Sequence, residues 1–151
     1  MPNWCNNELT IKGRKSEIER FLRVVRTTHS RFDFNTISPE PETLETGKEI
    51  EKCYQWRDKN WGTNHLIDER TLWISPGSIS PDACQFEIEL CFDTAWTPPI
   101  PVVLEASKRF PKLEFDLEYY ELDGTFFEGV YQVKNGINLM ERHGLIDFNA
   151  I

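Results

Sequence analysis

Apolar and polar residues alternate strictly in two stretches of the second half of the chain. Residues 86–93 place an apolar side chain at every even position, and residues 113–121 begin with one at every odd position. A period of two predicts β-strands that bury one face and expose the other. The same pattern predicts a first strand at residues 4–11 and a strand at residues 126–133, which follows an Asp-Gly turn sequence.

Shorter apolar stretches predict two further strands, at residues 32–37 and 71–75, each followed closely by a proline. The stretch between them, residues 39–70, begins with many Pro, Glu and Lys residues. This composition indicates an inserted loop or a loose helix. Residues 137–151 are weakly patterned, and we interpret them as a short helix or a tail.

Two segments have the apolar spacing of helices. Residues 16–29 carry apolar side chains at the i, i+3, i+4 and i+7 positions of one helix face, and Ser16 with Glu19 has the spacing of a capping box. Residues 98–110 form the second expected helix, with Thr97 as its N-cap and proline in its first turn. Each helix is therefore expected to bury one face.

The expected elements follow one another as β-α-β-β-α-β, with one more strand at the end. This is the order of the split βαβ, or ferredoxin-like, arrangement. We therefore expect an α+β fold in which an antiparallel sheet carries two helices on one face. A length of 151 residues suits a single domain. That domain would span residues 1–151, with an insertion at about residues 39–70 and a C-terminal extension at about residues 134–151.

Charge and cysteine content narrow the classes of protein. The formal net charge is −8, and the excess lies in the second half: residues 1–75 hold 12 basic and 12 acidic side chains, and residues 76–151 hold 5 and 13. No apolar run reaches the roughly 18 residues of a membrane span, and the polar N-terminus lacks a signal-peptide pattern, so we predict a cytoplasmic protein away from membranes. Four cysteines without CxxC spacing indicate free thiols.

Few residues suggest catalysis or metal binding. None of the three histidines, His29, His65 and His143, has a second ligand-type residue at a metal-like spacing. The motifs of phosphate loops, nucleophile elbows, zinc proteases and dinucleotide-binding turns are absent from the sequence. We therefore predict no metal, no cofactor and no catalytic residue, although a missing motif does not by itself exclude an enzyme.

Basic residues gather near the first helix, in residues 12–31. They have the pattern of a phosphate-contacting stripe, and equally that of a solvated helix face with an i,i+4 ion pair. The negative charge of the rest of the chain opposes approach to a polyanion and favours the second interpretation. Nucleic acid is therefore not expected as a partner.

Acidic side chains occupy the outward positions of three predicted strands. In a ferredoxin-like sheet the first strand lies between the strands at 86–93 and 113–121, so these carboxylates are expected on one open face. One interpretation is a solvated face that is charged to prevent association. The other is a binding surface for a protein partner with a basic surface. The residues are Glu8, Glu87, Glu89, Asp93, Glu114, Asp116 and Glu118.

Tryptophan residues in polar, turn-rich strings suggest a second candidate site. Such residues often need a partner for the indole N–H and keep one edge open, whereas Trp73, which lies among apolar residues, is expected in the core. The set can line one concave pocket, or it can fasten loops to the edge of the sheet. The residues are Trp4, Asn60, Trp61 and Trp96.

Four local strings, taken in order, resemble the YubB-like family carried by phages and plasmids. The resemblance covers residues 1 to about 133, and it implies a ferredoxin-like domain, a mobile-element origin and no established activity. It supplies no catalytic residues. The strings are MPNWCNN at residues 1–7, NWGT at 60–63, TAWTPP at 94–99 and the stretch 119–129, which ends in FFEG.

Two classes of function follow from these observations. The first is an accessory protein of a mobile element that acts by protein–protein interaction, with the acidic face bound to a basic surface of a host protein. The second is a small-ligand-binding protein or an enzyme that uses the tryptophan-lined region. A deep pocket with perturbed titratable groups distinguishes the second class from the first. The sequence carries no signal for an oligomeric state.

Overall fold

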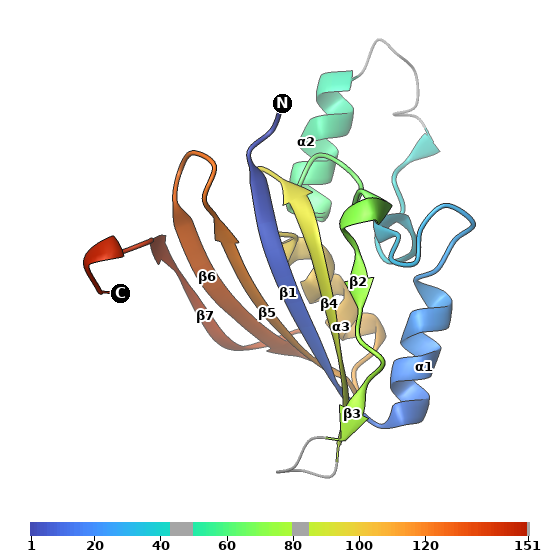
Figure 1. The fold of residues 1–151 in the computed structure, drawn as a ribbon. Coiled ribbons are helices and arrows are strands. Elements are labelled where there is room, and N and C mark those ends of the chain that lie inside the picture. The colour runs from blue at the N-terminus through green and yellow to red at the C-terminus, as the bar shows by residue number, and fades with distance from the viewer. Residues whose placement is uncertain (43–49, 80–84, 151) are drawn as a thin grey trace.

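One antiparallel sheet crosses the molecule (Figure 1), in a computed structural model that describes residues 1–42, 50–79 and 85–150. The strand order is β2-β4-β1-β5-β6-β7, and β3 also pairs with β4. The strands are β1 (Trp4–Gly13), β2 (Trp73–Ile74), β3 (Ser78–Ile79), β4 (Phe86–Ala95), β5 (Glu114–Glu121), β6 (Phe127–Lys134) and β7 (Ile137–Leu145). The helices are α1 (Lys15–Val24), α2 (Ile50–Asn60) and α3 (Ile100–Arg109), with short 3₁₀ turns η1 (Phe34–Thr36), η3 (Glu69–Thr71) and η4 (Phe148–Ala150).

The core lies between α1, α3 and one face of the sheet. β1 buries every second residue from Cys5 to Ile11. Phe21 of α1 meets Phe110, just after α3, and Phe115 of β5, with ring centroids 5.1 and 5.6 Å apart in edge-to-face geometry. Such pairs add about 0.5–1.5 kcal/mol beyond the burial of their area. The expected α+β architecture with an antiparallel sheet is confirmed.

β1 is a central strand, and its register defines the two faces of the sheet. Leu9 lies opposite Leu90 of β4 and Leu117 of β5, and all three side chains are buried. Because side chains alternate along a strand, the neighbouring positions on all three strands point the other way. We call this second side the open face, and Figure 1 shows none of the labelled helices in front of it.

The strand expected at residues 32–37 is wrong, because this segment forms η1 and flanking turns. The Asp33 carboxylate accepts a hydrogen bond from the Asn35 N–H at 2.9 Å, and the Thr36 hydroxyl donates to the Asp33 carbonyl at 2.6 Å. These local bonds replace a strand ladder. The apolar residues of the segment are nevertheless buried in the core, as Phe34 and Ile37 illustrate.

Both helices begin at residues other than those expected. α1 starts at Lys15 with Arg14 as N-cap and no side-chain cap, so Ser16 lies inside the helix, which ends at Val24 rather than near residue 29. α3 starts at Ile100 after Pro99. Thr97 does not cap it, because its hydroxyl donates to the carbonyl of Gly62 instead. The apolar face of α1 is as expected, since Ile18 and Phe21 are buried.

The C-terminal stretch is a strand, and the expectation of a short helix or tail is wrong. β7 pairs with β6 at the edge of the sheet, and every one of its residues is exposed. Alternation marks a strand only where one face is buried, so this segment lacked the pattern. The two-residue strand β3 was missed as well. In the expected insertion, α2 forms the helix, and residues 43–49 lie outside the described residues.

Candidate functional site

The register of three strands places the seven predicted carboxylates on the open face. Glu8 of β1 lies between Cys91 and Glu118, and Thr10 lies between Glu89 and Asp116. At two other open-face positions of β1, Lys12 lies between Glu87 and Glu114, and Asn6 lies between Asp93 and Tyr120. Two acidic columns on β4 and β5 therefore run along either side of β1.

Lys12 partly neutralises this face, a feature that the sequence reasoning left out. Its Nζ lies 2.8 Å from Asp116 Oδ2 and 3.8 Å from Glu114 Oε2. The hydrogen bond to Asp116 raises the pKa of Lys12 above its ordinary value. Burial, with the neighbouring charge of Asp116, raises the pKa of Glu114. The signal was present in the sequence, because Lys12 continues the outward positions of Glu8 and Thr10.

Two other polar groups of the face have fixed partners. Asn6 Nδ2 donates to Asp93 Oδ1 at 2.6 Å, which ties the end of β4 to β1. Cys91 Sγ donates to Glu89 Oε1 at 3.2 Å. Burial, with the hydrogen bond and charge of Glu89, raises the pKa of Cys91 to about 12, so this residue is a protonated thiol at neutral pH. A thiol in that state is a poor nucleophile.

Strands β6 and β7 extend the open face beyond the predicted residues. Glu128 adds an eighth carboxylate opposite Tyr120, whereas Lys134 and Arg142 add two cations. A groove of about 880 Å³ crosses this region. Its lining combines acidic, aromatic and apolar groups, among them Glu8, Glu118, Tyr120, Glu128, Arg142 and Phe148. The described strands thus place eight carboxylates against three cations on one surface.

The tryptophan strings meet in space, but they do not form one lined pocket. Trp4 begins β1 opposite Ala95, and the Trp96 N–H donates to the Asn3 carbonyl at 2.8 Å, so the two ends lie together as expected. Trp61 has no exposed surface, and its indole N–H donates to the Ser38 carbonyl at 2.9 Å. The amide of Asn60 donates to the Trp56 carbonyl at 2.9 Å within α2.

Trp73 and Trp61 show the opposite of the burial that their sequence context predicted. Trp73, expected in the core, lies on β2 opposite Cys91 with 54% of its surface exposed, whereas Trp61 is a core residue. Trp61 packs against Phe34 and Trp56 at centroid distances of 5.8 and 5.5 Å. Trp96, which is 46% exposed, combines exposure with a neighbouring cleft.

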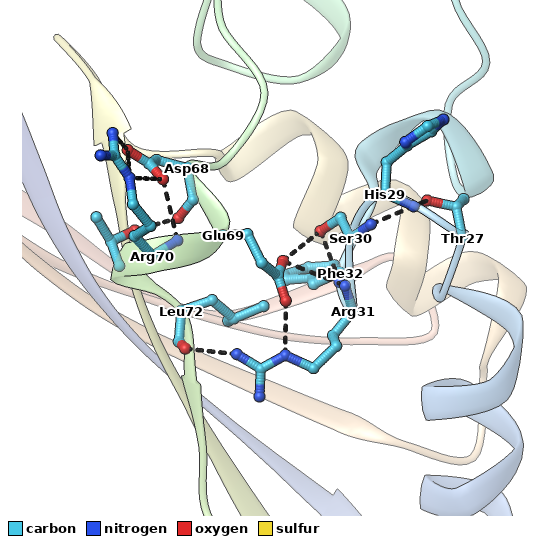
Figure 2. Close-up of polar contacts among 10 residues, drawn as sticks. Thr27, His29, Ser30, Arg31, Phe32, Asp68, Glu69, Arg70 and Leu72 are labelled. Atoms are coloured by element: carbon cyan, nitrogen blue, oxygen red, sulfur yellow. Dashed lines mark hydrogen bonds and ion pairs between the residues drawn. The ribbon is translucent and has the colours of Figure 1, made fainter.

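A polar cluster holds the segment before β2 (Figure 2). Glu69 accepts hydrogen bonds from Ser30 Oγ at 2.9 Å and from Arg31 Nε at 2.6 Å, and Arg31 Nη2 donates to the Leu72 carbonyl at 2.7 Å. Burial opposes ionisation of Glu69, but the hydrogen bonds from Arg31 and Ser30 keep its pKa below the ordinary value. The polar groups of this cluster bond to one another and to the carbonyl of Leu72, the residue before Trp73. We therefore interpret the cluster as a structural clamp that positions Trp73.

The histidines lie apart from one another. His29 donates its backbone N–H to Thr27 Oγ1 beside the clamp, and His65 stacks on Tyr54. His143 of β7 stacks on Tyr119, and its Nδ1 lies 2.9 Å from the Tyr119 hydroxyl. Among the described residues, no group of three His, Cys, Asp or Glu side chains is placed to hold a metal ion.

Comparisons with known proteins identify the fold and no activity. Residues 80–149, a little under half of the chain, match the model of a family described as the ferredoxin-like domain in Api92-like protein. No curated protein matches the sequence. The crystal structure of the protein api92 from Yersinia pseudotuberculosis superposes with a TM-score of 0.57 and 11% sequence identity, over 98% of this chain and 100% of that chain. The chain therefore resembles, in its second half, the ferredoxin-like domain of Api92-like proteins, a family without an assigned function.

Proposed function

We propose that this protein acts by binding another protein, and that its open face docks on a basic surface of that partner. The observation that carries the proposal is the excess of carboxylates on this face, eight against three cations on the described strands. Charged surfaces of this kind increase association rates and select partners of opposite sign. The exposed aromatic groups Tyr120 and Trp73 add apolar contact area to the same surface.

The spacing of the carboxylates suggests what the basic partner surface normally binds. Neighbouring strands lie about 4.8 Å apart, and same-face residues along one strand repeat every two residues, or about 6.6 Å. The spacing along one acidic column is of the same order as the separation of neighbouring phosphates along a nucleic-acid strand. We therefore propose a partner whose basic surface normally contacts nucleic acid. The acidic face would occupy that basic surface in place of the nucleic acid. Nucleic acid itself is repelled by this face.

We also propose that the protein originates from a phage or plasmid and acts in the cytoplasm. The local strings that resemble the YubB-like family support a protein carried by a phage or plasmid, which occupies a host protein in the cytoplasm. In the described part of the chain, no helix has the length and apolar character to cross a membrane. The origin is tested by sequencing the DNA that flanks the gene, where integrase, replication or transfer genes are expected and uninterrupted host genes would contradict it.

The central test neutralises the acidic face without disturbing its ion pairs. The variant carries Glu87→Gln, Glu89→Gln, Glu118→Gln and Glu128→Gln and leaves Lys12 with Glu114 and Asp116. A matched control neutralises four glutamates outside this face, Glu19, Glu42, Glu51 and Glu105. We expect the face variant to lose at least about tenfold in affinity for an oligolysine peptide and to capture no host partner, while the control retains both. Equal loss in both variants would mean that net charge, rather than this face, drives binding.

A further inference from the structure

Trp96 occupies a strained backbone conformation. Its φ is +70°, a region that bulky residues rarely adopt, and the Thr97 N–H donates to the Ala95 carbonyl at 2.8 Å, which closes a three-residue γ-turn around it. A conformation of this kind is energetically unfavourable and persists only where the surroundings enforce it. Contacts with neighbouring residues must therefore hold the turn in this conformation.

Hydrogen bonds from three directions enforce the turn. The Trp96 N–H donates to the Asn3 carbonyl at 2.8 Å, and the Thr94 hydroxyl donates to the Thr97 carbonyl at 2.7 Å. The hydroxyl of Thr63 donates to the Ala95 carbonyl at 2.7 Å. Thr63 and Thr94 are almost fully buried, so these bonds are protected from water. The network fixes the backbone on both sides of Trp96.

The side chain of Trp96 is only partly buried in the folded chain. Almost half of its surface is exposed, at 46%. Within the described ranges, its indole N–H has no hydrogen-bond partner and its ring contacts no other aromatic ring. A glycine would satisfy the same backbone bonds without strain. The fold thus holds a large aromatic group out toward solvent at an energetic cost, which suggests a role in binding.

A cleft of about 580 Å³ lies beside Trp96, between the end of α2 and the start of α3. Its lining includes Asp58, Asn64, Pro98 and Pro101. Asp58 has no ion-pair or hydrogen-bond partner among the residues that the structure describes. The neighbouring Arg57 does not neutralise it, because Arg57 Nε lies 2.8 Å from Glu40. Burial raises the pKa of Asp58, and the neighbouring His65 opposes this shift.

We propose that Trp96 and Asp58 bind an arginine side chain of a partner polypeptide. The face of a tryptophan ring attracts a cation, and a nearby carboxylate supplies the opposite charge. A planar guanidinium can stack on the indole and donate to Asp58 at the same time, whereas a lysine ammonium is a hydrated point charge that cannot stack. This site uses residues that the open face does not contain, so the inference goes beyond the proposed docking of that face.

The test titrates the uniformly ¹⁵N-labelled protein with a capped Gly-Arg-Gly peptide and follows the indole N–H signals by NMR. The matched probe is the same peptide with citrulline, which keeps the shape of arginine and lacks its charge. We expect the Trp96 indole signal to shift with the arginine peptide and at least about tenfold weaker binding of the citrulline peptide. Equal binding of both peptides, or no shift of the Trp96 signal, would overturn the proposal.

Two variants locate the site, and two controls separate it from the open face. Trp96→Gly suits the positive φ, so the turn and the fold should be retained. Because this variant lacks the indole reporter, the backbone amides of Gly62 and Asn64, which line the cleft, are followed instead, and their response to the arginine peptide should disappear. Asp58→Asn should weaken binding at least about tenfold. Trp73→Ala and the open-face variant should leave the Trp96 response unchanged. If arginine binding survives both cleft variants, or is lost only with the open-face variant, the assignment to Trp96 and Asp58 is wrong.

Discussion

At the residue scale, one glycine allows an aromatic side chain to cross between strands. A Cβ placed on Gly129 of β6 would lie 2.1 Å from the Tyr119 hydroxyl oxygen and 2.6 Å from the Arg142 carbonyl oxygen. The Tyr119 hydroxyl passes this position to reach His143 on β7. The requirement is for space rather than for an unusual backbone angle, since Gly129 is not among the residues of positive φ.

We predict that Gly129→Ala destabilises the protein by about 1–3 kcal/mol, because the added methyl group overlaps a side chain and a backbone atom. The control is Gly144→Ala on the neighbouring strand, where an added Cβ meets no atom within 4 Å. Urea unfolding followed by tryptophan fluorescence measures both values. An unchanged free energy of unfolding for Gly129→Ala would show that Tyr119 moves aside without cost.

A second prediction at this scale concerns Glu121, a fully buried residue at the end of β5. Its carboxylate accepts hydrogen bonds from the backbone N–H groups of Asp123, Thr125 and Phe126 at 3.0, 2.7 and 2.8 Å. Glu121→Gln removes the charge and one acceptor oxygen, so we expect a loss of about 1.5–3 kcal/mol. Glu118→Gln, an exposed substitution on the same strand, should change the free energy of unfolding by less than about 0.5 kcal/mol.

At the element scale, sequence patterns predicted the strands that bury one face, and also the short strand β2, but they missed β3 and β7. Strict alternation identified β4 and β5, because apolar side chains of these strands meet helices on one side and water on the other. β7 has no buried residue, and β3 is only two residues long, so neither produces a periodic signal. The same limit explains Trp61, whose polar neighbours in the sequence hid a core position reached by tertiary packing.

The acidic face could be predicted from the sequence only where the pairing of its strands could be predicted. The carboxylates share one face because β1 pairs with β4 and β5 as the ferredoxin-like order requires. Lys12, Glu128 and Arg142 belong to that face too, but the latter two depend on the positions of β6 and β7. The turn at Trp96 was not predictable, because its strain arises from hydrogen bonds to residues distant in the sequence.

At the scale of the whole molecule, several buried acids that are neutral at pH 7 determine the response to alkali. Burial raises the pKa of Cys5, Tyr119 and Tyr131 to about 12, and partial burial, with the hydrogen bond and charge of Glu89, raises the pKa of the half-buried Cys91 to about 12. A group whose pKa is higher in the folded state contributes stability that is complete below its unfolded pKa and is lost as pH rises through the folded value.

We therefore predict that the free energy of unfolding is constant near neutrality and falls steadily from about pH 9 toward pH 12, the interval between the unfolded thiol pKa and the folded one. Urea unfolding at a series of pH values measures this dependence. The double variant Cys5→Ala, Cys91→Ala should show a shallower fall above about pH 9, since the two thiols no longer contribute. A free energy of unfolding that rises over this interval would contradict the burial of these groups.

Distribution of charge over the molecule separates the open face from the opposite, helix-covered side. α1 and the residues around it are rich in basic groups, whereas the open face carries the acidic columns of β4 and β5. A partner with a basic surface would thus be attracted to one side and repelled by the other. Such orientation speeds association at low ionic strength and is screened by salt over a distance of about 8 Å at physiological concentration.

The measurement that tests the central claim most directly maps where a basic ligand binds. An oligolysine peptide is titrated into the ¹⁵N-labelled protein at low salt, and the backbone amide shifts are recorded. The account predicts that the largest shifts fall on β1, β4 and β5 around Glu8, Glu89 and Glu118, and that they vanish at high salt. Shifts that fall on α1 and α3, or are spread evenly over the surface, would contradict the docking function of the open face.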